Sequence, residues 1–298
     1  MIEVRQCRKS FGERLVLDGL QFAVEQGDTY GLLGPNGAGK TTAINILCNL
    51  LEADDGTVLI NGSPVSEATK FTVGVVPQEI SIYKDLTCRE NMLFFGKVYG
   101  LRDPERTDRV NELVRIFHLE EYARTQVSKM SGGWQRRVNI AVALVHSPGV
   151  LILDEPTAGL DVEARYELWE LIAGLQSRGV TILLTTHHLD EAERLCSRIG
   201  IMRGGRIVAE GSLDELRKLV PARQLAVVET GSEETLLARV SSLGWEHRRY
   251  GGRLTLLLPR EFSLREIVET LDGVPLTSIS LREVGLEHVY MEAGAGMN

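Results

Sequence analysis

The chain has 298 residues, of which 43% are hydrophobic, and a formal net charge of -8 at pH 7. This length and composition suit one large globular domain followed by a small one. The acidic balance argues against a broad nucleic-acid surface, because such a surface needs clustered Lys and Arg to displace counterions from phosphates. We therefore expect no nucleic-acid partner.

Membrane-spanning and secreted classes are also disfavoured. No run approaches the roughly 18 apolar residues that cross a bilayer, and the first residues, MIEVRQCRKS, lack the apolar core of a secretory signal. The cysteines stand singly in the sequence, which indicates small buried side chains rather than a metal or redox pair. They are Cys7, Cys48, Cys88 and Cys196. We expect a cytoplasmic protein.

The first strong pattern is a glycine-rich loop after the apolar run 29–33. Its glycines let backbone N–H groups point at phosphate oxygens, and the helix that follows adds the positive end of its dipole. The lysine of the loop would reach the β- and γ-phosphates, and the next hydroxyl would ligate Mg²⁺. The loop and its first helical residues are Gly34, Pro35, Asn36, Gly37, Ala38, Gly39, Lys40, Thr41 and Thr42.

The pattern from about residue 86 becomes helical. The segment RTDRVNELVRIFHLEEY carries Val110, Leu113, Val114 and Phe117 at helical spacing. We predict a helical insert over about 86–145.

Two later apolar runs, 150–153 and 180–184, predict parallel strands that are buried on both faces, like 29–33. Polar residues that follow such strands meet at one edge of the sheet. Asp154 and Glu155 follow the first of these runs. Adjacent carboxylates are usually a solvated turn or a helix cap, but after four buried positions they need a cationic partner such as Mg·ATP. One carboxylate could bind Mg²⁺ and the other could activate water, so the sequence predicts nucleoside triphosphate hydrolysis.

A second, smaller domain is predicted after a break near Val220–Pro221. We expect strand 225–229, helix 233–243, two strands that flank 251–252, helix 264–271 and strand 276–281. This β-α-β-β-α-β order is typical of a ferredoxin-like unit. A further short helix is predicted over 286–291.

The segment SKMSGGWQRRVNIAVAL resembles the signature motif of ABC ATPases, which is usually read as LSGGQ. Ser131, Gly132 and Gly133 would form a second anion-binding helix start. In that family the second face on the nucleotide comes from another protomer, so the resemblance implies a nucleotide-bridged homodimer. The motif departs from the usual form at Met130 and Trp134, which puts any role of a glutamine side chain there in doubt.

Other positions match the same family in order. Phe11 resembles the aromatic that stacks on adenine, and Gln78 resembles the loop glutamine that senses metal and phosphate. Asp161 resembles the aspartate of the D-loop, and His187 resembles the switch histidine, with His188 as a rival. Taken alone, Phe11 would be core filler and Gln78 a solvated loop residue.

The resemblance covers residues 1 to about 220. It implies an α/β fold, with a P-loop ABC ATPase core over 1–220 and a small α/β domain over 221–298. The cofactors would be ATP and Mg²⁺, with Thr41, Gln78 and Asp154 as metal ligands. The catalytic residues would be Glu155, as general base, with His187 and Gln78.

The same resemblance implies a transport motor that is bound to the cytoplasmic face of the membrane through a separate transmembrane permease. Phe94, Phe95 and Tyr99 could line the groove that docks the permease, or they could simply pack within the insert. The ending LREVGLEHVYMEAG resembles the antibiotic-export branch of daunorubicin-resistance type, which favours an exporter. An importer ATPase is the alternative, and a soluble ABC protein acting on ribosomes or DNA is disfavoured by the single cassette and short insert.

Overall fold

The computed structural model describes residues 1–295, and the chain forms two compact units, Met1–Glu210 and Gly211–Asn298. The division lies earlier in the chain than the sequence break at Val220–Pro221. Helix α7 (Leu213–Arg217) belongs to the second unit, where it contacts α10 (Leu286–Ala295).

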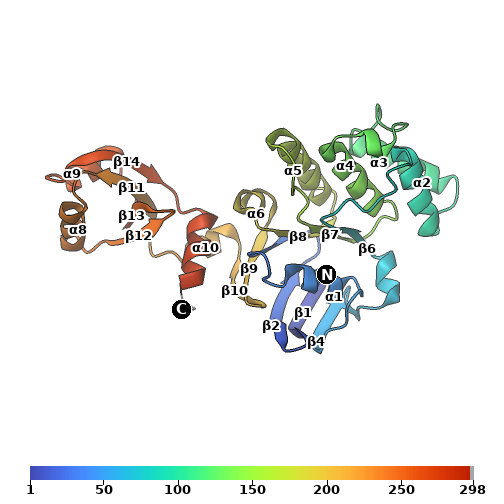
Figure 1. The fold of residues 1–298 in the computed structure, drawn as a ribbon, viewed down its shortest axis with the longest axis horizontal. Helices are drawn as coiled ribbons and strands as arrows, with labels where there is room; N and C mark the ends of the chain where they lie inside the picture. Colours follow the sequence, from blue (N-terminus) through green and yellow to red (C-terminus); the bar gives the residue numbers. More distant parts are fainter. Residues whose placement is uncertain (296–298) are drawn as a thin grey trace. The chain divides into compact units, whose positions relative to one another are not determined.

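The first unit is built on a six-stranded sheet in the order β10-β9-β3-β8-β7-β6 (Figure 1). The pairs β9–β3, β3–β8, β8–β7 and β7–β6 are parallel. The three predicted strands are present and buried at every position, as expected for a sheet covered on both faces. The strands are β3 (Thr29–Leu33), β6 (Val73–Val76), β7 (Val150–Asp154), β8 (Thr181–Thr186), β9 (Arg198–Arg203) and β10 (Arg206–Gly211).

A second sheet in this unit is antiparallel, in the order β2-β1-β4-β5. Its strands are β1 (Ile2–Phe11), β2 (Arg14–Val24), β4 (Asp55–Ile60) and β5 (Ser63–Pro64). The pairing of β1 with β2 shifts register three times, so the side chains do not alternate regularly between buried and exposed. This sheet was not among the sequence predictions.

The helical insert is present. Helix α4 contacts β6, and α2 contacts both α3 and α4 beside that edge of the sheet (Figure 1). A capping box between Thr87 and Glu90 fixes the start of α2. The helices of the unit are α1 (Lys40–Leu47), α2 (Cys88–Val98), α3 (Glu105–Ile116), α4 (Gly132–Ala143), α5 (Val162–Gln176) and α6 (Leu189–Leu195), with 3₁₀ turns Glu67–Phe71 and Val127–Lys129.

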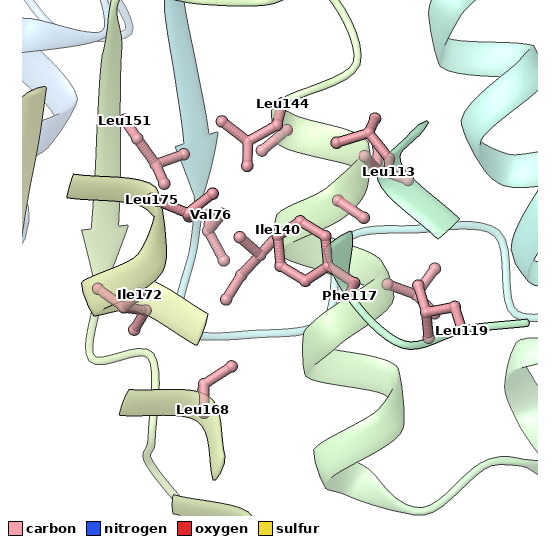
Figure 2. Close-up of a cluster of buried hydrophobic side chains, with 14 of the residues drawn as sticks. Val76, Leu113, Phe117, Leu119, Ile140, Leu144, Leu151, Leu168, Ile172 and Leu175 are labelled. Atoms are coloured by element: carbon pink, nitrogen blue, oxygen red, sulfur yellow. The ribbon is translucent and has the colours of Figure 1, made fainter. Parts of the chain in front are cut away.

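The insert and the sheet share one buried apolar cluster (Figure 2). Ile140 of α4 lies in the middle of this cluster, between Phe117 at the end of α3 and Leu151 of β7. Leu168, Ile172 and Leu175 of α5 complete the cluster. Helix α4 is therefore fixed against the strands that carry the candidate site.

The second unit has the predicted β-α-β-β-α-β order, with an antiparallel sheet β12-β13-β11-β14. Helices α8 and α9 share a buried apolar cluster with β11 and β13, and His288 of α10 contacts Tyr250 of β12. The elements are β11 (Gln224–Thr230), α8 (Glu233–Ser242), β12 (Glu246–Tyr250), β13 (Arg253–Leu258), α9 (Leu264–Thr270) and β14 (Leu276–Arg282). The predicted final helix is the start of α10.

Within residues 1–295, none of the helices combines the length and the apolar character that a membrane crossing requires.

Candidate functional site

The glycine-rich loop joins β3 to α1 and is closely packed. Gly39, directly before the helix, has φ +107°, a conformation that favours glycine. A Cβ atom on Gly39 would lie 2.8 Å from Cδ2 of Leu17 and 2.9 Å from Cε of Met202. The backbone conformation therefore favours glycine here, and a Cβ atom would also displace the Leu17 and Met202 side chains.

Lys40 begins α1 and is buried, with 6% of its surface exposed. Its Nζ donates hydrogen bonds to the carbonyl oxygens of Gly34, at 2.7 Å, and of Pro35, at 3.3 Å. It also lies 3.7 Å from Oε1 of Glu155. Burial lowers the pKa of the Lys40 ammonium, and Glu155 and Asp154 oppose that shift. The loop thus holds a desolvated cation that donates its hydrogen bonds to neutral carbonyl oxygens. Hydrogen bonds to a phosphate anion would be stronger.

Two carboxylates face this lysine from the end of β7. Asp154 accepts a hydrogen bond from the hydroxyl of Thr185 on the neighbouring strand. The Glu155 N–H donates to the Thr185 carbonyl at 3.0 Å. Glu155 has φ +47°, which is uncommon for a non-glycine residue and costs backbone energy.

His187, after β8, is the histidine that reaches this carboxylate. Its Nδ1 lies 2.7 Å from Oε2 of Glu155. His188 is the N-cap residue of α6, and its backbone N–H donates to Oγ1 of Thr186 at 2.9 Å. Of the two adjacent histidines, the structure brings His187 into the site.

These groups surround a cavity of about 420 Å³. Sequence reasoning missed two of the residues that line it, Arg14 and Val16 at the start of β2. Arg14 pairs across the hairpin with Phe11 and belongs to no motif, so only folding places it here. The predicted residues that line the cavity are Asn36, Gly37, Gly39, Lys40, Thr41, Thr42, Gln78, Glu155 and His187.

The other predicted residues do not line this cavity. Phe11 is 51% exposed and therefore is not core filler. Asp161 caps α5, because its carboxylate accepts from the Ala164 N–H at 2.8 Å. The remaining ones are Gly34, Pro35 and Ala38 of the loop, Asp154, and the signature residues Ser131, Gly132 and Gly133.

The signature residues stand at the start of α4. Ser131 is the N-cap residue, yet its side chain makes no capping hydrogen bond. Both Ser131 and Gly132 are exposed. The helix start therefore offers an exposed hydroxyl and exposed N–H groups, which is what an anion needs.

The donors expected for Mg²⁺ fit a hard cation. Thr41, Gln78 and Asp154 offer hydroxyl, amide and carboxylate oxygens, and the first two line the cavity. Over the described part of the chain, no three His, Cys, Asp or Glu side chains gather as metal ligands. A cation here would also need oxygens from the substrate phosphates, whose charge it would neutralise.

This geometry defines a P-loop nucleoside triphosphatase. Residues 17–158 match the family model described as ABC transporter. Nod factor export ATP-binding protein I of Burkholderia lata is 46% identical over 214 residues, covering 71% of this chain and 70% of the relative. Linearmycin resistance ATP-binding protein LnrL of Bacillus subtilis is 33% identical over 302 residues, covering 98% of this chain and 97% of the relative.

Solved structures of ABC transporter cassettes are also similar to this chain. One described as the ATP-binding subunit of an ABC transporter has a TM-score of 0.66 and 32% identity, and covers 73% of this chain and 92% of its own. A second is an ATP-binding cassette solved as a dimer in a post-hydrolysis state with ADP and Pi. It has a TM-score of 0.64 and 27% identity, and covers 71% of this chain and 98% of its own. The chain belongs to the ABC transporter family, as an ATP-binding and ATP-hydrolysing subunit.

Proposed function

We propose that this subunit powers export through a separate transmembrane permease. The carrying observation is the similarity to the linearmycin resistance protein, which extends over 98% of this chain and so includes both units. That relative's name refers to resistance and the Nod factor relative's name refers to export. Both favour export over import.

The site residues act in this proposal by charge and position. Lys40 neutralises phosphate charge, because its ammonium is already desolvated and held beside the loop. Thr41, Gln78 and Asp154 hold Mg²⁺. Glu155 orients and activates water, and His187, at 2.7 Å from Glu155, steadies that carboxylate and contacts the terminal phosphate.

A second copy of the chain completes the site. The signature residues do not line the cavity of their own subunit. Ser131 is exposed, and its side chain makes no capping hydrogen bond. Two copies related by a two-fold axis can each place this helix start on the nucleotide of the other. Similar cassettes are described as dimers, which supports the arrangement. Phe11 and Asp161 would contact nucleotide and partner in this dimer.

The permease would dock on exposed aromatic side chains beside α2. Phe94 is 42% and Tyr83 52% exposed, and their rings lie 4.9 Å apart. Phe95 and Tyr99 are partly buried and pack on the apolar cluster of the insert, so they support this surface more than they form it. Through this contact the subunit would lie on the cytoplasmic face of the membrane.

The dimer is tested with a variant that binds nucleotide but hydrolyses it slowly. Glu155→Gln with Mg·ATP should run as a dimer in light scattering after size exclusion, and as a monomer without nucleotide. Adding Ser131→Arg should keep ATP binding and abolish the dimer. The larger arginine side chain would occupy the space that the phosphates of the nucleotide bound to the partner subunit need. A Glu155→Gln protein that binds ATP and stays monomeric, alone and with its permease, would contradict the proposal.

Docking is tested by co-expressing this chain with a candidate multi-span permease and measuring whether the two co-purify. Tyr83→Ala with Phe94→Ala should lose the permease while ATP binding is kept. Leu50→Ala, which removes a 70% exposed apolar side chain elsewhere on the unit, is the matched control and should keep it.

A further inference from the structure

We propose that Arg136 is a positioning residue that ties the loop carrying Gln78 to the signature helix α4. The inference rests on the proposed function, in which Gln78 acts on the nucleotide of its own subunit and the start of α4 acts on that of the partner. It assigns to Arg136 a mechanical link between the two.

The contacts are specific. Arg136 lies on α4 and is 3% exposed. Its Nη1 donates to the carbonyl oxygen of Pro77 at 2.7 Å, and its Nη2 donates to that of Gln78. The Gln78 side chain itself is exposed and lines the nucleotide cavity. One guanidinium therefore holds the backbone of Gln78 while leaving its amide free for the site.

The surroundings make this link hard to replace. None of the ion pairs in the described part of the chain includes Arg136, so the two carbonyls carry most of its hydrogen bonding. Burial lowers the pKa of Arg136, and the buried carboxylates Asp154 and Glu191 oppose that shift. A guanidinium can reach two carbonyls at once through its fixed fork, whereas an ammonium is a single point charge. Lysine at this position would keep the charge but hold the loop less firmly.

The neighbouring arginine has a different role. Arg137 pairs with Glu167 of α5, and its guanidinium lies 4.3 Å from the Trp134 ring. It binds α4 to another helix, not to the Gln78 loop. The link to the site is thus a property of Arg136.

The consequence is coupling between the two faces of one subunit. Arg136 follows Ser131 and Gly132 by about one helical turn, so a tilt of α4 that seats the helix start on the partner's nucleotide also moves the Gln78 backbone. Engagement of the dimer and placement of Gln78 are then one motion. A displacement of a catalytic group by about 1 Å can reduce turnover by about 100-fold.

The test uses the full chain with Arg136→Lys. We expect it to fold and bind Mg·ATP like the wild type, to hydrolyse ATP about 10- to 100-fold more slowly, and to exchange backbone hydrogens faster in the peptide around residues 77–80 without nucleotide. Arg136→Ala should behave alike and regain hydrolysis when guanidinium chloride is added at a non-denaturing concentration. Arg109→Lys is the matched control, because Arg109 donates to the Leu144 carbonyl at 2.8 Å and does not line the cavity. It should leave hydrolysis and exchange at 77–80 unchanged.

A double-mutant cycle separates this role from simple stabilisation. If Arg136 acts through Gln78, Arg136→Lys should have little further effect on turnover in a Gln78→Ala background. Additive effects, or a folded Arg136→Lys protein with wild-type turnover and exchange, would overturn the link while leaving the ATPase assignment intact. A wild-type chain that neither binds nor hydrolyses ATP would instead overturn the proposed function.

Discussion

Nδ1 of His187 lies 2.7 Å from Oε2 of Glu155, while the other oxygen of that carboxylate lies 3.7 Å from Nζ of Lys40. The carboxylate is thus held between the histidine that follows β8 and the lysine that begins α1. Its backbone, at φ +47°, is fixed by the hydrogen bond to Thr185. This arrangement orients the proposed base before any substrate arrives.

Replacing His187 should therefore slow hydrolysis. We expect His187→Ala to lower the turnover number about 100-fold, a typical loss for a group that orients a general base, and to change ATP affinity little. His188→Ala should stay much closer to wild-type turnover, because His188 does not line the cavity and contacts it only through the His187 ring, whose centroid lies 4.1 Å from its own. Steady-state ATPase assays on both variants decide between the two histidines, and equal losses would contradict the assignment.

Lys40→Ala should act mainly on binding. Removal of a charged hydrogen-bond donor to phosphate costs about 1.5–3 kcal/mol, or roughly 10- to 100-fold in the ATP dissociation constant. Titration calorimetry of the nucleotide measures this loss. Lys70→Ala, which removes an exposed lysine paired with Glu67, is the control and should bind ATP normally.

The sequence predicted those parts of the site that lie in continuous motifs. The strands β3, β7 and β8 are buried at every position and each contains an apolar run, and the residues after those runs were recognised by spacing. The antiparallel sheet was not predicted. Register shifts near Gln6, at φ +48°, break the alternation of buried and exposed side chains that indicates a strand. Contacts such as Arg136 with Pro77, 59 positions apart, carry no local signal at all.

Arg14 is the clearest addition that the structure makes to the site. Its Nη2 would lie 3.9 Å from a Cβ placed on Gly37, so the guanidinium stands over the phosphate loop. Arg14 is exposed, and none of the ion pairs among residues 1–295 includes it. A cation here should attract the nucleotide phosphates, with a strength that salt reduces.

We expect Arg14→Ala to weaken ATP binding by roughly fivefold at low ionic strength, as for a partly exposed charge pair worth about 1 kcal/mol, and by less at high salt. Arg178→Ala, an exposed arginine outside the cavity, should have no effect. Binding measured at two salt concentrations tests this. A loss that does not depend on salt would argue that Arg14 acts by packing and not by charge.

His146 predicts a pH dependence of stability. Burial lowers its pKa from 6.5 to about 4, the Val73 carbonyl near Nε2 opposes that shift, and Arg109 adds to it. Its ring also stacks on Tyr99 at 3.8 Å. Between about pH 6.5 and about pH 4 the unfolded chain binds a proton that the folded chain does not, so stability falls as the pH is lowered through this window.

His146→Phe should weaken that dependence. The melting temperature of the wild type should fall more between pH 7 and pH 5 than that of the variant, because phenylalanine keeps the stack and takes up no proton. Tyr99→Phe also keeps the stack and retains His146, so it should follow the wild-type slope. If His146→Phe and the wild type share one slope, His146 is not the group responsible.

Trp134, the unusual residue of the signature, is engaged inside its own subunit. Its ring stacks on Tyr122 at 4.3 Å, and the Arg137 guanidinium lies 4.3 Å from the same ring. An aromatic stack and a cation–π contact of this kind contribute about 0.5–1.5 and about 0.5–2 kcal/mol. The indole therefore stabilises α4 through contacts within its own subunit, while Ser131 and Gly132 remain exposed at the start of the helix.

Trp134→Gln should accordingly lower the melting temperature, by an amount that matches about 1–3.5 kcal/mol of lost stabilisation, without preventing dimerisation. In a Glu155→Gln background with Mg·ATP, below its melting temperature, it should still form the dimer. Ser131→Arg in the same background should do the reverse: it should lose the dimer with Mg·ATP, while its melting temperature measured without nucleotide should change little, since the Ser131 side chain makes no capping bond. Loss of the dimer in folded Trp134→Gln would mean that the indole faces the partner subunit, and that the usual glutamine position has kept an intermolecular role in this chain.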